Sequence, residues 1–373
     1  MERPAQGGAA IARLADGRVC FVEGALPGEV ALVELTKAGR DFAKGLARRI
    51  LEAHPQRVSP RCPLFGRCGG CSMQHASFPL QLELLEASVR DTFRRFTGVE
   101  LPASFKISYG EPWHYRNRAR ALKTANGFGF REAASHRAIE FRTCAVLVPA
   151  LDDFFHSQTA RKLRASELEA FENGRGEVAY FYEGMAPQAF AAHAETLVEV
   201  AGRELSMDAE VFFQSNLGLL PELVKAVRKA AGSGELLIDL FSGVGFFAAL
   251  LQESFGRVVA VERDRHCLRH AKRNLGPPAE FVTEPAEEWL LKTVVGPGAT
   301  LIVDPPRTGL PKPAAEALAQ SALSRLLYVS CDPVTLARDS KFLSGSGFKI
   351  SSAEAFAFYP QTPHLEMLAV LER

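Results

Sequence analysis

The fold is decided by residues 236–245, which read Leu-Leu-Ile-Asp-Leu-Phe-Ser-Gly-Val-Gly. A short apolar run ends here in two closely spaced glycines, a pattern typical of a buried strand that turns sharply into a helix. Further apolar runs that end in polar residues lie at 258–262, 300–304 and 326–330. Helical patterns over 265–275 and 313–323 separate them. This alternation predicts an α/β domain in which helices cover a parallel sheet and a ligand binds at the carboxyl ends of the strands.

The glycine turn suits a nucleoside-type ligand. Gly243 and Gly245 allow a tight turn and a close approach of the backbone to the ligand, but two glycines do not make a dinucleotide fingerprint. Glu262 ends the next strand, where a carboxylate would bind ribose hydroxyls. Because no phosphate-binding lysine accompanies the turn, S-adenosylmethionine fits better than ATP. A purely structural turn with a surface glutamate is the alternative.

Four cysteines stand in a metal-binding spacing. Cys62, Cys68 and Cys71 form a C-x5-C-x2-C run, and Cys144 is the obvious fourth ligand. Four thiolates can hold either zinc or an iron–sulfur cluster, and the spacing does not separate the two. Three buried thiols that happen to lie close together are the structural alternative. With 7 cysteines in a chain of 373 residues, a disulfide framework is not expected.

Three further residues suggest chemistry on a pyrimidine. Cys331 lies in Val-Ser-Cys-Asp-Pro, Asp304 in Val-Asp-Pro-Pro-Arg, and Glu366 in His-Leu-Glu. Pyrimidine C5 becomes nucleophilic only after a group such as a thiolate adds to C6, and a base must later remove the C5 proton. Taken singly, a buried cysteine and surface carboxylates would be ordinary structural residues. Their combination with the donor-type turn supports a catalytic set.

Composition and charge divide the chain. Hydrophobic residues make up 47% and charged residues 23%, as in ordinary globular proteins. The net charge is +1, yet residues 1–150 hold 22 basic and 14 acidic side chains, and the remainder is acidic overall. We therefore expect a nucleic-acid surface on the first half. Neither a secretory leader nor an apolar run long enough to span a bilayer is found, which favours a cytoplasmic protein.

Together these motifs resemble the family of S-adenosylmethionine-dependent uracil-5 RNA methyltransferases over nearly the whole chain. The resemblance implies an N-terminal TRAM domain over 1–55, an oligonucleotide-binding (OB-type) β-barrel, which the short strands and glycine turns there also favour. It implies a central α+β domain over 56–205 whose four cysteines hold a [4Fe–4S] cluster. A Rossmann-like methyltransferase domain would occupy 206–373.

The resemblance also assigns roles. Gln214, in Phe-Gln-Ser-Asn, would contact the methionine part of the donor, and Phe241 and Glu262 match further donor contacts. Asp304 would contact donor and pyrimidine, Cys331 would be the nucleophile and Glu366 the base. The sequence departs from the family at Phe246, where asparagine is frequent, and at Glu284-Pro285.

The expected partner is RNA, with 23S rRNA favoured over tRNA, and neither DNA nor a membrane. A monomer is expected. The segment 113–120 mixes aromatic and cationic residues, which suits stacking on unpaired bases, although a solvated basic strand is the alternative. Rival interpretations are a non-catalytic RNA-binding protein and an iron–sulfur oxidoreductase, for which the sequence shows no flavin or nicotinamide fingerprint. A cytosine-5 enzyme is disfavoured because Cys331 follows serine rather than proline.

Overall fold

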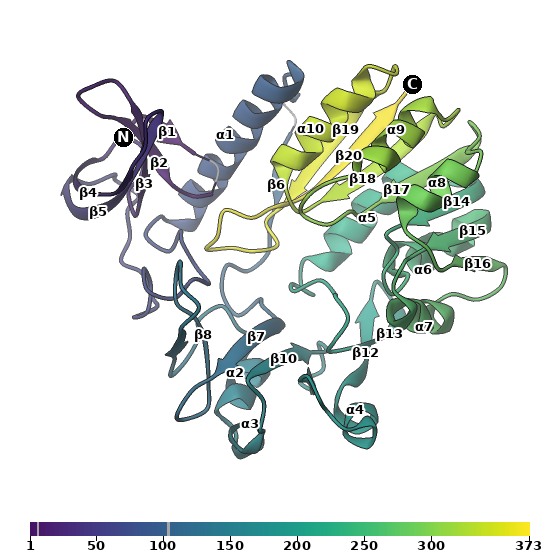
Figure 1. The fold of residues 1–373 in the computed structure, drawn as a ribbon, viewed down its shortest axis with the longest axis horizontal. Helices are drawn as coiled ribbons and strands as arrows, with labels where there is room; N and C mark the ends of the chain where they lie inside the picture. Colours follow the sequence, from purple (N-terminus) through teal and green to yellow (C-terminus); the bar gives the residue numbers. More distant parts are fainter. Residues whose placement is uncertain (6, 103–104) are drawn as a thin grey trace.

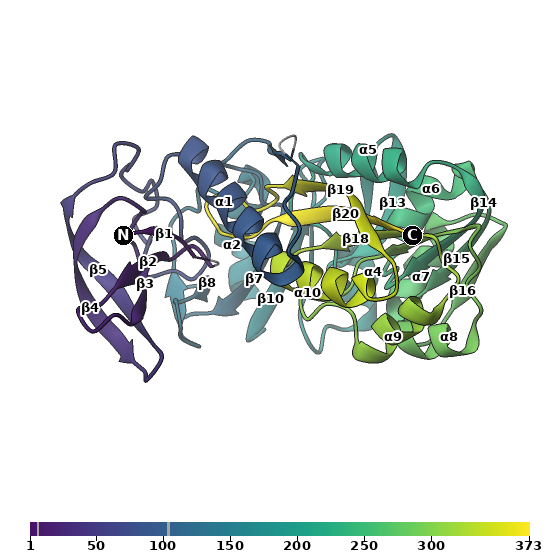
Figure 2. The same cartoon turned by 90° about the horizontal axis from the view of Figure 1, so that it is seen from above.

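The computed structural model describes residues 1–5, 7–102 and 105–373. An N-terminal sheet, a central region and a C-terminal layered domain follow one another along the long axis of the molecule (Figures 1 and 2). In the described part of the chain, no helix is both long and apolar enough to cross a membrane.

The N-terminal sheet has the strand order β1-β2-β3-β5-β4. Its strands are β1 (Arg3–Pro4), β2 (Ala10–Arg13), β3 (Val19–Glu23), β4 (Val30–Ala38) and β5 (Phe42–Glu52). Its small core includes Ala10, Cys20 and Val22, all buried. The buried carboxylate of Glu29 accepts hydrogen bonds from Arg57 (2.6 Å) and from the backbone N–H groups of Leu26 and His54. This ion pair ties the sheet to the chain that follows it.

The central region contains a second sheet of order β11-β10-β7-β8-β9 and a two-stranded ribbon, β12-β13. Its strands are β7 (Arg118–Lys123), β8 (Phe128–Arg131), β9 (Ala138–Glu140), β10 (Glu167–Glu172), β11 (Val178–Phe181), β12 (Glu195–Val200) and β13 (Arg203–Asp208). Short helices lie beside them: α2 (Pro149–His156), α3 (Gln158–Lys162) and α4 (Pro187–His193).

The C-terminal sheet has the order β16-β15-β14-β17-β18-β20-β19-β6. Its strands are β6 (Ile107–Ser108), β14 (Gly234–Leu240), β15 (Phe255–Val261), β16 (Ala279–Val282), β17 (Ala299–Val303), β18 (Arg325–Ser330), β19 (Lys349–Phe356) and β20 (Glu366–Glu372). Strands β14 to β18 are parallel, whereas β20 is antiparallel to both of its neighbours. The predicted strands and parallel sheet are confirmed.

Helices cover both faces of this sheet (Figure 2). They are α5 (Leu220–Ala231), α6 (Phe246–Leu251), the short 3-10 helix η1 (Gln252–Ser254), α7 (Arg265–Asn274), α8 (Ala286–Lys292), α9 (Lys312–Gln320) and α10 (Pro333–Ser344). Alternation along β14 explains the layers, because Leu237 packs against α5, α6 and α7, whereas Ile238 and Leu240 pack against α8, α9 and α10.

Helix α1 (Phe78–Thr97) joins the parts of the molecule. Ser77 caps its first turn, and the left-handed Gly98 ends it. Its buried stripe, which includes Val89 and Phe93, belongs to the same core as α8, α9 and α10. At the other side Asp91 pairs with Arg3 of the N-terminal sheet at 2.9 Å. Thus α1 and the edge strand β6 come from the central segment of the sequence but pack on the C-terminal sheet.

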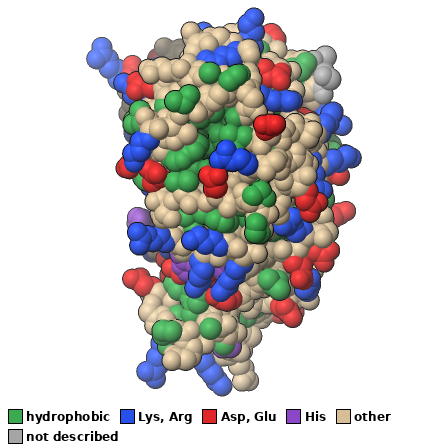
Figure 3. All heavy atoms as spheres, turned by 90° about the vertical axis from the view of Figure 1, so that its right-hand side faces the viewer, with side chains coloured by type: hydrophobic (Ala, Val, Ile, Leu, Met, Phe, Trp, Pro, Cys, Tyr) green, Lys and Arg blue, Asp and Glu red, His purple; other side chains and the backbone are tan. Residues whose placement is uncertain are grey.

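Charges of both signs are interspersed on the face at the end of the C-terminal domain (Figure 3). Such a mixed surface gives little attraction for a polyanion, in contrast to a patch of one sign.

Candidate active site

The donor loop after β14 is shaped by left-handed backbone. Phe241, Gly243 and Gly245 have φ of 62°, 53° and 77°. A Cβ on Gly245 would lie 2.7 Å from Leu275 Cδ1, so only glycine fits there without a shift. The Gly243 N–H donates to Glu262 Oε2 at 3.0 Å, which holds that carboxylate at the end of β15. The turn and the acidic residue predicted from the sequence are therefore joined directly.

This loop opens onto a cavity of about 550 Å³ at the carboxyl ends of the strands. Most of the predicted site residues line it, namely Gln214, Phe241, Gly243, Glu262, Asp304, Cys331 and Glu366. Gly245 is not one of the lining residues and packs instead against Ala271 and Leu275. Phe246 and Pro285 also line the wall, so apolar contact replaces the side-chain hydrogen bonds that other residues would offer there. The structure brings the predicted donor and catalytic residues into one space.

Strand register places the catalytic candidates together. Cys331 follows β18 and Glu366 begins β20, and these antiparallel strands pair Ser330 with Met367. Cys331 and Glu366 are therefore adjacent across the ladder. Asp304 follows β17, the other neighbour of β18. The thiol is held just before α10, whose first turn is capped by Asp332 through a 2.8 Å bond from Val334 N–H.

Burial dominates the electrostatics of these groups. It raises the pKa of Asp304 to about 7. Burial and the neighbouring Asp304 raise the pKa of Glu366 well above its usual range. Burial, together with the two carboxylates, raises the pKa of the Cys331 thiol to about 11. Glu366 Oε1 has no hydrogen-bond partner among the described residues. Such a cluster of acids favours a cationic ligand, since a positive charge would stabilise their ionised forms.

Two residues that the sequence analysis did not single out also line the cavity. Arg307 lowers the pKa values of both Cys331 and Glu366, against the dominant effect of burial. The sequence could have indicated Arg307, because this residue ends the Asp-Pro-Pro-Arg motif that begins at Asp304. Burial raises the pKa of Tyr359 to about 12, and this residue has no local motif that could have revealed it.

The predicted metal ligands also meet. Cys62, Cys68, Cys71 and Cys144 line a separate cavity of about 250 Å³. The Gly70 N–H donates to Cys68 Sγ at 3.4 Å, so the backbone of the loop folds around this sulfur. Burial raises the pKa of Cys71 to about 12, which a bound cation would reverse by stabilising the thiolate.

The basic and aromatic segment 113–120 divides into different roles. The Arg61 guanidinium lies 4.6 Å from the ring centroid of Trp113. Tyr115 is buried and donates to Pro360 O at 2.8 Å. Arg118 is mostly buried and donates to the Ala209 carbonyl at 3.0 Å. The latter two side chains are therefore occupied inside the fold, and the expectation that they stack on or pair with RNA is wrong for them.

The parallel sheet carries a glycine turn and, at Glu262, a carboxylate placed to bind ribose hydroxyls. A cysteine and two further carboxylates face them across the cavity. These features together are those of a methyltransferase of the α/β class. Residues 297–373 match the family described as tRNA (Uracil-5-)-methyltransferase, and residues 2–47 match the TRAM domain. Asp304, Cys331 and Glu366 all lie within the first match. The TRAM domain and the Rossmann-like methyltransferase fold expected from the sequence are confirmed.

Related proteins agree. An uncharacterized RNA methyltransferase of Treponema denticola is 30% identical over 98% of this chain and 96% of its own length. The 23S rRNA (uracil(1939)-C(5))-methyltransferase RlmD of Edwardsiella ictaluri is 32% identical over 95% of this chain and 91% of its own length. The Pyrococcus abyssi tRNA (uracil-54, C5)-methyltransferase, solved with S-adenosyl-L-homocysteine, shares the fold at a TM-score of 0.73 and 24% identity, covering 98% of this chain and 100% of that one. The chain belongs to the S-adenosylmethionine-dependent uracil-5 RNA methyltransferases, which methylate C5 of uracil in RNA.

Proposed function

We propose that this enzyme methylates one uridine of 23S rRNA through a covalent adduct between Cys331 and C6 of the base. The observation that carries the proposal is the convergence of Cys331, Glu366 and Asp304 on the cavity that the donor loop also lines. The choice of 23S rRNA rests on the relative of Edwardsiella ictaluri, which this chain matches over 91% of its length.

The chemistry follows from the positions of the side chains. Cys331 loses its proton to solvent and adds through Sγ to C6, and the electrons of the C5–C6 double bond move towards O4 as an enolate. C5 then attacks the methyl carbon of the donor, and the donor sulfur leaves as a thioether. Glu366 accepts the proton from C5, the double bond re-forms, and Cys331 leaves as a thiolate. Asp304, whose pKa is about 7, can donate a hydrogen bond to the pyrimidine in its protonated form.

The donor would be held by residues on both sides of the cavity. Gln214 is buried, and its Oε1 has no partner in the described part of the chain, so it can accept from the amino group of the methionine moiety. Glu262 would bind the ribose hydroxyls. Phe241 and Phe246 would contact the donor through their rings. The sulfonium charge would offset the negative charge of the ionised Glu366.

We further propose that the four cysteines hold a [4Fe–4S] cluster. Zinc bound by four thiolates would bring the sulfur atoms to about 3.8 Å from one another, because Zn–S bonds are about 2.3 Å. Among the described residues, no three of these thiols have their sulfur atoms within 4.8 Å of one another. The cavity of about 250 Å³ between them suits a larger group. Because methyl transfer moves no electrons to or from an acceptor, the cluster would serve to fix the loops around Cys71 and Cys144.

The cluster is tested by metal analysis of protein purified without oxygen. We expect about four iron and four acid-labile sulfide per chain. One zinc per chain without acid-labile sulfide, in protein kept free of oxygen throughout, would contradict the proposed [4Fe–4S] cluster.

The reaction and its substrate are tested with RNA that contains 5-fluorouridine. Fluorine cannot leave as a proton, so the adduct should persist on a denaturing gel when 23S rRNA fragments and donor are present. Cys331→Ala should form no adduct, whereas Cys267→Ala, which removes another thiol of the same cavity, should still form it. An adduct formed by Cys331→Ala would refute the assignment of Cys331 as the nucleophile. An adduct with tRNA alone would favour the second candidate, a tRNA uridine, which the description of the matched family supports.

A further inference from the structure

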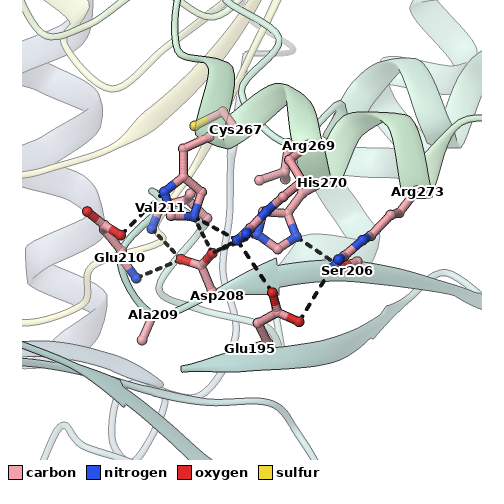
Figure 4. Close-up of polar contacts among 12 residues, drawn as sticks. Glu195, Ser206, Asp208, Ala209, Glu210, Val211, Cys267, Arg269, His270 and Arg273 are labelled. Atoms are coloured by element: carbon pink, nitrogen blue, oxygen red, sulfur yellow. Dashed lines mark hydrogen bonds and ion pairs between the residues drawn. The ribbon is translucent and has the colours of Figure 1, made fainter. Parts of the chain in front are cut away.

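Outside the catalytic cavity, two histidines and an aspartate meet between the β12-β13 ribbon and α7 (Figure 4). Asp208 ends β13, and His266 and His270 stand one turn apart on α7. We call these three residues the His–Asp cluster. Their nitrogen and oxygen ligand atoms all lie within 4.8 Å of one another. The proposed catalytic steps do not use them.

The geometry of the His–Asp cluster centres on one oxygen atom. Asp208 Oδ2 lies 2.6 Å from His266 Nε2 and 2.7 Å from His270 Nε2. The other oxygen, Oδ1, accepts from the backbone N–H groups of Glu210 and Val211. Asp208 and His270 are fully buried, whereas the His266 side chain is 27% exposed. The carboxylate is therefore fixed in orientation, and the cluster can be reached from the surface beside His266.

Outer partners orient both imidazole rings. His266 Nδ1 lies 3.3 Å from the Glu210 carboxylate, and His270 Nδ1 lies 2.9 Å from Ser206 Oγ. When Nδ1–H donates to these acceptors, Nε2 of each ring is free to act as a ligand atom. The present Nε2–Oδ2 distances are hydrogen-bond distances, so a bound ion would replace the Nε2 protons and move the ligand atoms apart to about 3.3 Å, as tetrahedral bonds of about 2.0 Å require. This is the arrangement in which histidines bind metals, with the second ring nitrogen held by an acceptor.

A guanidinium already lies close to this point. Arg269 Nη2 is 3.3 Å from Asp208 Oδ2 and 3.1 Å from His266 Nε2. The same nitrogen also reaches Glu195 at 3.4 Å, and the Arg269 side chain is 44% exposed. The guanidinium can therefore turn towards Glu195 and leave the position between Asp208 and His266 to another cation.

We propose that the His–Asp cluster binds a divalent cation of the zinc class. Two imidazole nitrogens and one carboxylate oxygen provide the borderline ligands that zinc prefers, and water would complete a tetrahedral site. The ion would join α7 to the ribbon. Because α7 begins after Glu262 and its Cys267 lines the donor cavity, the ion would stiffen the wall beside the donor without taking part in the reaction.

The experiment uses cluster-loaded protein, in which the four thiols are occupied, and Zn²⁺ as the probe. Equilibrium dialysis measures the zinc bound per chain, and X-ray absorption at the zinc edge separates nitrogen and oxygen ligands from sulfur. His266→Gln and His270→Gln keep a polar side chain but remove an imidazole. His136→Gln changes an exposed histidine elsewhere and is the matched control.

We expect one zinc per chain with a nitrogen and oxygen shell. Loss of an outer partner usually lowers metal affinity by about 10- to 100-fold, so loss of a ligand in His266→Gln or His270→Gln should lower it by at least about 100-fold. His136→Gln should bind as the parent protein does. His266 is partly exposed, so its variant carries the test if the buried His270→Gln does not fold. Absence of zinc binding, a sulfur-rich shell, or unchanged affinity in His266→Gln would overturn the proposal.

Arg269→Gln provides a second test. Removing the competing positive charge should leave zinc affinity equal or raise it, because the guanidinium would no longer have to be displaced. A weaker affinity in Arg269→Gln would contradict the claim that the guanidinium and the ion compete for the position between Asp208 and His266, and the proposal would then be wrong.

Discussion

Replacing either glycine of the donor loop by alanine adds the same methyl group in two different surroundings. Gly243 and Gly245 both have left-handed backbone, with φ of 53° and 77°. For an L-residue this conformation costs about 1–2 kcal/mol, so Gly243→Ala and Gly245→Ala share that contribution. Any difference between the two variants must therefore arise from the space around the new Cβ.

That space differs sharply. At Gly245 a Cβ would lie 2.7 Å from Leu275 Cδ1 and 3.1 Å from Ala271 Cβ, against α7 and the residue after it. At Gly243, apart from its two chain neighbours, none of the described residues has an atom within 4 Å of a Cβ placed there. Overpacking costs about 1–3 kcal/mol, so Gly245→Ala should lower the free energy of unfolding by about 2–5 kcal/mol and Gly243→Ala by about 1–2 kcal/mol.

Denaturant titration followed by circular dichroism measures both losses. A double-mutant cycle isolates the contact, because Leu275→Val removes the atom that the new methyl group meets. We expect Gly245→Ala to cost at least about 0.5 kcal/mol less when Leu275→Val is already present. Equal losses for the two glycines, or a larger loss at Gly243, would refute the packing argument.

Three further predictions follow from the ionised and buried groups. Glu366→Gln should form the methylated adduct but release the product about 10²- to 10⁴-fold more slowly, because no base accepts the C5 proton. Single-turnover gels measure this release, and a normal rate of release would exclude the role of Glu366 as the base. The rate with saturating donor and RNA should rise from acidic pH towards neutral, because burial and Asp304 raise the pKa of Glu366, which accepts a proton only when ionised. Above about pH 7 the rate should fall again, because Asp304 then loses the proton that it donates to the pyrimidine. A rate that falls from acidic to neutral pH would count against these roles. Glu29→Gln breaks a buried ion pair with Arg57 and should lower the free energy of unfolding by about 3–5 kcal/mol, whereas the exposed Glu23→Gln should change it by less than about 1 kcal/mol; equal effects in denaturant titrations would show that the pair contributes little.

Local pattern was sufficient for four of the five parallel strands, and only the edge strand β16 was not predicted. Strands β14, β15, β17 and β18 are buried on both faces, so each repeats the same short apolar signal before a polar end. Their parallel order also places Asp304 and Cys331 at one edge, which explains why the candidate site could be assembled from motifs alone. The position of Glu366 depends on the antiparallel insertion of β20, a long-range pairing that periodicity does not encode.

The surface on which a helix or strand packs is harder to predict from the sequence than the helix or strand itself. Apolar residues recur at a helical period over 80–96, at Leu80, Leu84, Leu85, Val89, Phe93 and Phe96, and this pattern predicts α1. An apolar stripe can pack on any apolar surface, so the place of α1 beside α10 did not follow from it. The two residues of β6 are too few to show alternation. Asp208 is separated from His266 by 58 positions, and no motif links them, so the His–Asp cluster appears only in the folded chain.

Helix α1 holds the N-terminal sheet and the C-terminal domain at a fixed separation. One side of the helix reaches the TRAM sheet through Asp91, and the other packs on the layer beside α10, which begins just after Cys331. Gln81 also exchanges hydrogen bonds with Gln361, in the loop before β20. An RNA held by the N-terminal sheet would therefore meet Cys331 at a set distance. We expect nucleotides to be chosen partly by their spacing from a second binding point, so that lengthening the RNA between the two points impairs methylation even when the target uridine is unchanged.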